Sequence, residues 1–304
     1  MHVILLSSTA GWHIDELVRA VSARGLVPVV LPWEANVSRM GPGSGVSNGA
    51  QVLREARAVL PRIIPAGSLE QIIYRVDTLH RLEDEGVRVM NTARVIERTV
   101  DKAWTSAILD QAGLPTPETV ACESAEDAFA AFRTMGDVVV KPLFGSMGLG
   151  MSRVSDEDMA WRVFRVIETI RGVYYLQRFI PHAGRDIRVF VVGDRVLGAI
   201  ERSAATWRTN FSRGGSVASH ALTSEGADLA IRAARAVGAE YAGVDLLPGL
   251  DGTVYVLEVN GIPGWEGLQR ATGIDVAGAV VDQLLGRDAS NRTLEPRSRS
   301  RSTP

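Results

Sequence analysis

The stretch VYVLEVNGIPG at residues 254–264 predicts a β-strand that ends in two polar side chains. Alternation places four side chains on one face, namely Val254, Val256, Glu258 and Asn260. The opposite face is wholly apolar, so the strand is expected to be buried on both sides. A buried carboxylate and a buried carboxamide are costly unless a partner satisfies them. The end of this strand therefore needs a binding partner.

A hairpin turn at Asp251-Gly252 is expected to fold the segment AGVDLL back along this strand. The turn brings Asp245 to within a few residues of facing Glu258. The oxygens of Asp, Glu and Asn side chains suit Mg²⁺, which takes one or two carboxylates together with substrate phosphates. The same residues could instead form a polar network at a sheet edge. These residues alone leave both interpretations open.

The segment VVVKPLFGSMGLG places a lysine, Lys141, directly before a glycine-rich loop. Gly145, Gly148 and Gly150 would allow backbone N–H groups to approach phosphate oxygens closely. The pattern matches neither a Walker loop nor the dinucleotide fingerprint that opens a helix. It indicates either a phosphate-binding loop of another kind or an ordinary hairpin loop.

A third segment, from residue 186 to residue 215, is dense in arginine. Asp186 and Arg188 share the polar face of a strand, and Glu201 and Arg202 end its hairpin partner. A loop follows with Arg208, Asn210 and Arg213. Guanidinium groups bind carboxylate and phosphoryl oxygens in a bidentate manner, which favours an anion site. A solvated basic loop is the alternative.

Composition excludes several classes of protein. The chain has 304 residues, 46% of them hydrophobic and 22% charged, as in an ordinary folded protein. No apolar run approaches the roughly 20 residues that cross a bilayer, and no secretory signal is recognised at the start, so a cytoplasmic site of action is expected. A formal net charge of −2 argues against a nucleic-acid partner, and the single cysteine excludes a zinc site of several thiolates.

The order of predicted elements is mixed α/β (α+β). The amino-terminal part opens with a βαβ-like unit, then a glycine- and serine-rich loop or loose hairpin near residues 38–49, and then a helix with a Ser68/Gln71 capping box. Ser155 is expected to open a later helix. We predict units at residues 1–97, 98–184 and 185–287, followed by a disordered tail at 288–304.

Taken together, seven ordered segments closely resemble the RimK-like α-L-glutamate ligases of the ATP-grasp superfamily. They are RTVDK, VVVKPLFGSMGLG, LQRFI, DIRVFVVGD, AIERSAATWRTNFSRGG, AGVDLL and LEVNGIPGWEGL. The resemblance spans about residues 95–285. It implies an ATP-grasp fold with an amino-terminal Rossmann-like pre-ATP-grasp domain, in which residues 98–184 form the small lid subdomain and residues 185–287 carry the metal site.

The resemblance also implies site residues. Lys102 and Lys141 would contact ATP phosphates, with the loop of Gly145, Ser146 and Gly148 closing over them. Adenine would be held through the backbone and a ring face of the strand around Gln177, Arg178, Phe179 and Ile180. The nucleotide site would also be lined by Asp186, Arg208 and Asn210. Two Mg²⁺ or Mn²⁺ ions would be held by Asp245, Glu258 and Asn260. Arg178 departs from relatives that have Glu there, and a guanidinium cannot accept a hydrogen bond from the nucleotide.

The implied activity is that of an ATP-dependent carboxylate–amine ligase. L-Glutamate would be joined to a carboxylate acceptor through an acyl phosphate, releasing ADP and phosphate. Arg202, Lys141 and Arg213 are the candidate catalytic residues, and Arg202 would hold the acyl phosphate. The alternatives are a ligase that extends a ribosomal protein or peptide carboxyl terminus, a ligase that uses another amine, and a non-catalytic ATP-binding module. A homo-oligomer is also implied.

The acceptor is suggested by residues 61–91, which resemble the ligases that add glutamate to a pterin or deazaflavin coenzyme, the tetrahydromethanopterin:α-L-glutamate ligase type. The segment predicts an amphipathic helix with Arg75, His80 and Arg81 on or near its polar side. Arg62 precedes it and is expected to face the cleft. These cations could receive an anionic acceptor, or they could be solvated charges on a helix that only packs on the sheet.

Overall fold

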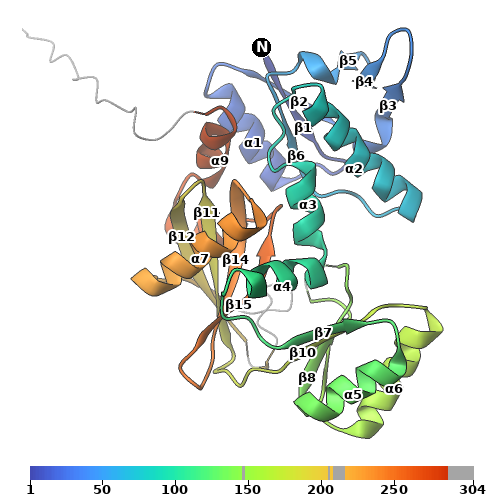
Figure 1. The fold of residues 1–304 in the computed structure, drawn as a ribbon. Helices are drawn as coiled ribbons and strands as arrows, with labels where there is room; N and C mark the ends of the chain where they lie inside the picture. The colour runs from blue at the N-terminus through green and yellow to red at the C-terminus, as the bar shows by residue number, and fades with distance from the viewer. Residues whose placement is uncertain (146–147, 205, 208–215, 287–304) are drawn as a thin grey trace, which may run out of the picture.

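The strands of the chain form four β-sheets in the part that this computed structural model describes, residues 1–145, 148–204, 206–207 and 216–286 (Figure 1). Helices and sheets are both present, and this confirms the mixed α/β class. No helix among the described residues is long and apolar enough to cross a membrane. The limits of the three predicted units and the tail stay a prediction.

A parallel sheet in the order β2-β1-β6 begins the chain. Its elements are β1 (His2–Leu6), α1 (Trp12–Ser22), β2 (Val27–Leu31) and β6 (Ala58–Pro61). The strands β1 and β6 are almost continuously apolar because both of their faces are covered. The segment VRVMN at residues 87–91 makes one isolated bridge to this sheet, from Val89 to Val59.

A small antiparallel sheet replaces the predicted loop after β2. It is made of β3 (Asn36–Arg39), β4 (Gly45–Asn48) and β5 (Gln51–Val52), with 3-10 turns η1 (Trp33–Ala35) and η2 (Leu53–Glu55) beside it. The helix α2 (Leu69–Asp84) then begins with the predicted capping box, in which Ser68 and Gln71 bond to each other's backbone N–H groups. The capping-box prediction is confirmed.

The middle of the chain forms an antiparallel sheet in the order β7-β10-β8-β9. Two helices lead into it, α3 (Ala93–Val100) and α4 (Lys102–Gln111). The strands are β7 (Thr119–Cys122), β8 (Val138–Lys141), β9 (Ser152–Val154) and β10 (Tyr174–Arg178), with α5 (Ala125–Met135) and α6 (Glu157–Thr169) packed on them (Figure 1). Asp156, not the predicted Ser155, caps α6, because its side chain accepts from the Met159 N–H.

The largest sheet has the order β13-β12-β11-β14-β15 and is antiparallel throughout. Its strands are β11 (Arg185–Val192), β12 (Arg195–Ser203), β13 (Ser216–Ser219), β14 (Tyr241–Pro248) and β15 (Val254–Asn260). Its helices are α7 (Ser224–Val237), α8 (Glu266–Thr272) and α9 (Val276–Leu284). The helix α9 packs beside α1, so one apolar core joins this sheet to the amino-terminal sheet. The predicted hairpin turn at Asp251-Gly252 is present, and a second turn at Gly193-Asp194 joins β11 to β12; Gly193 and Gly252 both have positive φ.

A β-bulge in β15 changes the predicted alternation of side chains. Asp245 pairs with Glu258 and Leu246 pairs with Val256, so Leu257 is an extra residue in the strand. Val256 therefore packs in the core, while Leu257 and Glu258 both line a pocket. The strand lies at the edge of its sheet, and its two faces are not both buried as was expected. The expectation that Val256 and Glu258 share one face was wrong.

Asn91 joins the amino-terminal part of the chain to the large sheet. Its side chain is 1% exposed. The Nδ2 group donates to the carbonyl oxygens of Tyr241, at 2.8 Å, and Gly261, at 2.7 Å, and Oδ1 accepts from the N–H of Glu240 at 2.8 Å. One buried carboxamide thus satisfies backbone groups at the start of β14 and beyond the end of β15.

We expect Asn91→Ala to lower the free energy of unfolding by about 3 kcal/mol, because several buried backbone groups lose their partner at once. Urea unfolding followed by circular dichroism measures the change. The exposed Gln111→Ala on α4 serves as the control and should unfold like the wild type. Equal unfolding midpoints for Asn91→Ala and the wild type would contradict this role.

Candidate functional site

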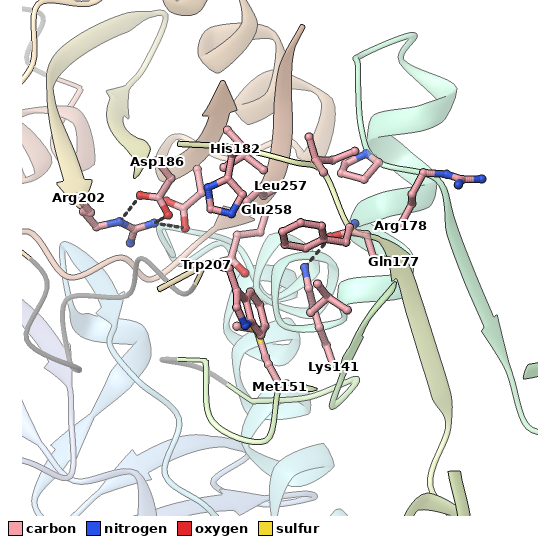
Figure 2. A pocket seen from close by; sticks show the side chains of 16 residues that line it. Lys141, Met151, Gln177, Arg178, His182, Asp186, Arg202, Trp207, Leu257 and Glu258 are labelled. Atoms are coloured by element: carbon pink, nitrogen blue, oxygen red, sulfur yellow. Dashed lines mark hydrogen bonds and ion pairs between the residues drawn. The ribbon is translucent and has the colours of Figure 1, made fainter. Parts of the chain in front are cut away.

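A pocket of about 680 Å³, counted out to its open mouth, lies between the middle sheet and the large sheet (Figure 2). The structure brings together in this pocket many of the site residues predicted from separate motifs. They are Lys141, Gln177, Arg178, Phe179, Ile180, Asp186, Arg202, Asp245 and Glu258.

The wall formed by the large sheet carries a chain of alternating charges. Arg202 donates from Nε and Nη2 to the two carboxylate oxygens of Asp186, at 2.6 and 2.8 Å. The same Nη2 lies 3.0 Å from Oδ2 of Asp245. Arg188 donates from Nε and Nη2 to the two oxygens of Asp245, both at 2.7 Å. Antiparallel pairing of β11 with β12 and β14 sets these residues opposite one another.

Burial and neighbouring charges shift the pKa values of these side chains in opposite directions. Burial alone would raise the pKa of Asp245, but Arg188 and Arg202 outweigh it and hold the pKa well below its usual range. Burial alone would lower the pKa of Arg202, but Asp245 and Asp186 outweigh it and raise the pKa. Asp245 therefore stays an anion and Arg202 a cation.

The predicted metal ligands lie at one end of this row of charged side chains. Asp245 faces Glu258 across β14 and β15, and Asn260 donates from Nδ2 to Oε1 of Glu258 at 3.1 Å. Arg188 Nη2 also approaches Glu258 Oε1, at 3.6 Å. The described residues contain no group of three or more His, Cys, Asp and Glu side chains that could hold a metal. Two carboxylates and one carboxamide, all hard oxygen donors, still fit Mg²⁺ or Mn²⁺.

The 304-residue sequence has two lysines, Lys102 and Lys141, and Lys141 lines the opposite wall of the pocket. Lys141 ends β8 and donates from Nζ to Oε1 of Gln177 at 2.6 Å. Burial lowers its pKa to about 8, and Glu258 partly opposes that shift. Lys102 opens α4, and its Nζ donates to the carbonyl oxygens of Leu143, at 3.3 Å, and Gly145, at 2.8 Å. Lys102 thus holds the glycine-rich loop, where Gly145, Gly148 and Gly150 adopt positive φ.

Two residues of the predicted adenine strand turn their side chains to protein partners. The guanidinium of Arg178 donates from Nε to Glu118, at 2.9 Å, and from Nη1 to the Met135 carbonyl, at 2.9 Å. Figure 2 shows it pointing away from Lys141. The Gln177 side chain is buried and accepts from Lys141. The expected contact of this strand with adenine runs through its backbone and a ring face, and it stays a prediction.

The amino-terminal arginines had two possible roles, as receivers of an anionic acceptor or as solvated charges. Arg62 is 4% exposed and donates from Nη2 to the Pro263 carbonyl at 3.1 Å, with its guanidinium 4.8 Å from the Trp265 ring centre. Arg75 is 5% exposed and donates from Nη1 to the Pro65 carbonyl at 2.7 Å. Arg81 bonds the loop around Ser44. Arg62 and Arg75 are therefore not solvated charges, and their contact with an acceptor stays a prediction.

Several predicted residues lie outside the part of the chain that the structure describes. They are Ser146, Arg208, Asn210 and Arg213. In the described part, sequence reasoning gave no site role to Arg188, although it noted that Arg188 shares a strand face with Asp186. The i, i+2 spacing was the signal that could have found it, because it places both side chains on one face of the sheet.

The fold is that of the ATP-grasp ligases. The ATP-grasp ligase PsnB, solved with its minimal precursor, Mg and ADP, matches with a TM-score of 0.71 and 23% identity, covering 94% of this chain and 97% of that one. A family model described as the RimK-like ATP-grasp domain matches residues 99–284. The chain belongs to the RimK-like ATP-grasp family and is a ligase, which confirms the resemblance seen in its seven motifs.

Two relatives match over almost their full lengths. The tetrahydromethanopterin:alpha-L-glutamate ligase of Methanosarcina acetivorans is 35% identical and covers 92% of this chain and 97% of its own. The ligase of the same name from Methanococcus maripaludis is 31% identical and covers 94% of this chain and 98% of its own.

We expect Lys141 to react with an amine-acetylating reagent as a group with a pKa of about 8. Below that pH its amine is protonated and unreactive, and above it the neutral form dominates. The yield of acetylated Lys141 peptide, measured by mass spectrometry across pH 6 to 11, gives the titration curve. The same protein unfolded in urea is the control, and its Lys141 should titrate near the ordinary 10.5. Identical curves for the folded and unfolded protein would refute the assignment.

Proposed function

We propose that the chain is an ATP-dependent carboxylate–amine ligase that adds L-glutamate to a carboxylate acceptor through an acyl phosphate. The observation that carries this proposal is the convergence of Lys141, Arg202, Asp245 and Glu258 at one pocket. Asn260 bonds to Glu258 beside it, and Lys102 bonds to the glycine-rich loop. Cations on both walls suit a triphosphate, and hard oxygen donors suit the metal that accompanies it. The match to a ligase solved with Mg and ADP supports ATP and magnesium here.

In the first step, a carboxylate oxygen of the acceptor attacks the γ-phosphorus of ATP and ADP leaves, forming the acyl phosphate. Lys141 and Lys102 neutralise phosphate oxygens as negative charge moves toward ADP. Asp245, Glu258 and Asn260 would hold Mg²⁺ or Mn²⁺, two ions in our proposal, which when bound supply charge neutralisation across the phosphates. Phe179 and Ile180 would line the adenine site, with Asp186, Arg208 and Asn210 completing the nucleotide site.

In the second step, the amine of L-glutamate attacks the acyl carbon and the phosphate leaves with the carbon–oxygen electron pair, giving the amide. Arg202 is held by Asp186 and Asp245, so it presents a fixed positive charge to the acyl phosphate. Arg213 is the other candidate for this charge. The ammonium of glutamate loses protons on the way to the amide, and no described side chain is assigned as their acceptor.

The acceptor we propose is a small pterin-type or related coenzyme. Two relatives at 35% and 31% identity are named as ligases acting on tetrahydromethanopterin, and their matches span the amino-terminal part of this chain as well as the ATP-grasp domain. We also keep a cytoplasmic location and a homo-oligomeric state as predictions.

Incubation of the purified protein with ATP, L-glutamate and Mg²⁺ should convert a reduced pterin or deazaflavin coenzyme into its glutamylated form, detected by mass spectrometry. ADP and phosphate should accumulate in step with the amide, since the γ-phosphoryl group activates the carboxylate. A ribosomal-protein tail peptide is the comparison acceptor and should give little product. Pyrophosphate and AMP in step with product would disprove the mechanism, and efficient extension of the peptide alone would disprove the acceptor.

Glu258→Gln and Asn260→Ala should each reduce kcat/KM about a thousandfold while leaving the unfolding midpoint near wild type. Loss of a metal ligand removes several kcal/mol of transition-state stabilisation, and these residues belong to a pocket wall rather than to the core. The exposed Glu126→Gln is the matched control. Wild-type turnover of either variant at saturating Mg²⁺ would remove that residue from the metal site.

A further inference from the structure

Gln177 lies at the centre of a buried polar network below the pocket. Its side chain is 2% exposed. Its Oε1 accepts from Lys141 Nζ at 2.6 Å, and its Nε2 donates to Thr119 Oγ1 at 3.1 Å and to the Tyr175 hydroxyl at 3.3 Å. The Tyr175 hydroxyl is in turn 2.8 Å from Ser106 Oγ on α4. The network therefore joins three strands of the middle sheet to the helix that begins with Lys102.

The neighbours of Gln177 fix which way its amide points. A lysine ammonium only donates, so it must meet the carbonyl oxygen of the amide. The two hydroxyls on the other side then receive the two amide hydrogens. Thr119 also donates to the Pro117 carbonyl at 2.8 Å, which leaves its lone pairs for Gln177. The amide oxygen is thus held toward Lys141 by contacts on its far side.

Gln177 holds Lys141 without adding charge. Lys141 is partly buried, within electrostatic reach of Glu258, Lys102 and Asp245, and the centre of the Tyr175 ring lies 5.9 Å from its Nζ. A glutamate at position 177 would form an ion pair with the ammonium and cancel much of its field. A neutral carbonyl orients the ammonium and leaves its positive charge for an anionic ligand.

We propose that Gln177 is a positioning residue that holds Lys141 toward the nucleotide phosphates and preserves its full charge for them. The proposal rests on the phosphate-binding role given to Lys141 under the proposed function. It gives the Gln177 side chain a role as partner of the phosphate lysine, beside the backbone contact with adenine expected of this strand.

The test compares Gln177→Met, Gln177→Glu and Lys141→Met in the full chain, with Gln111→Glu, an exposed change of the same kind on α4, as the control. The dissociation constant of ADP with Mg²⁺ is measured calorimetrically from pH 6.5 to 10. In the wild type this constant should rise as the pH passes the pKa of Lys141, which burial lowers to about 8. Lys141→Met should bind ADP weakly and lose that rise.

Gln177→Met should weaken ADP binding about tenfold at pH 7, as expected for one hydrogen bond to a charged group, and move the rise to lower pH. Gln177→Glu should also weaken ADP binding at pH 7. It should shift the rise in the dissociation constant to higher pH, by about one pH unit or more, because an adjacent carboxylate favours the charged lysine. Opposite shifts from two variants at one position are not expected of a residue that only packs.

If both Gln177 variants keep the wild-type pH profile while Lys141→Met loses affinity, the positioning role is wrong and the proposed function stands. If Lys141→Met binds ADP like the wild type, the phosphate role of Lys141 is wrong and the inference falls with it. Should Gln177→Met fail to fold, the isosteric Gln177→Glu still decides the question through the direction of its shift.

Discussion

The pocket depends on one buried carboxylate, Asp245, that is bonded to two arginines at once. Burying such charges carries a large desolvation cost, and a buried ion pair often contributes little net stability. The arrangement is explained better by what it provides, a fixed row of charges on one pocket wall. Four antiparallel strands, β11, β12, β14 and β15, supply that row, and their pairing keeps every member opposite its partner.

The two walls of the pocket differ in their sources of charge. The large sheet supplies carboxylates and arginines in close pairs, whereas the middle sheet and α4 supply lysines that bond to neutral oxygens. Among the described residues in and beside the pocket, four cationic side chains, Lys102, Lys141, Arg188 and Arg202, accompany three carboxylates, Asp186, Asp245 and Glu258. This excess favours a ligand with several negative charges, and in the described part of the chain neither lysine forms an ion pair.

Much of this site could be predicted from the sequence because strand alternation and hairpin turns are local properties. Asp245 was expected near Glu258 from one turn signal, and the structure pairs them directly. The bulge at Leu257 was not predictable, because an inserted residue does not stand out in the composition of a strand. The insertion reverses the faces on which the preceding side chains lie. The side-chain partners of Gln177 and Arg62 were missed for a different reason. These partners, Lys141 and Pro263, are distant in sequence, and no local pattern reports a tertiary hydrogen bond.

The central claim is that Asp245, Glu258 and Asn260 form the metal site of a nucleotide pocket. A crystal grown with ADP and Mn²⁺, with diffraction recorded at the manganese absorption edge, tests it most directly. The account predicts an anomalous peak at bonding distance from oxygens of Asp245 and Glu258 and from the nucleotide phosphates. A peak bound only by phosphates and water, with Asp245 and Glu258 out of reach of the ion, would contradict it.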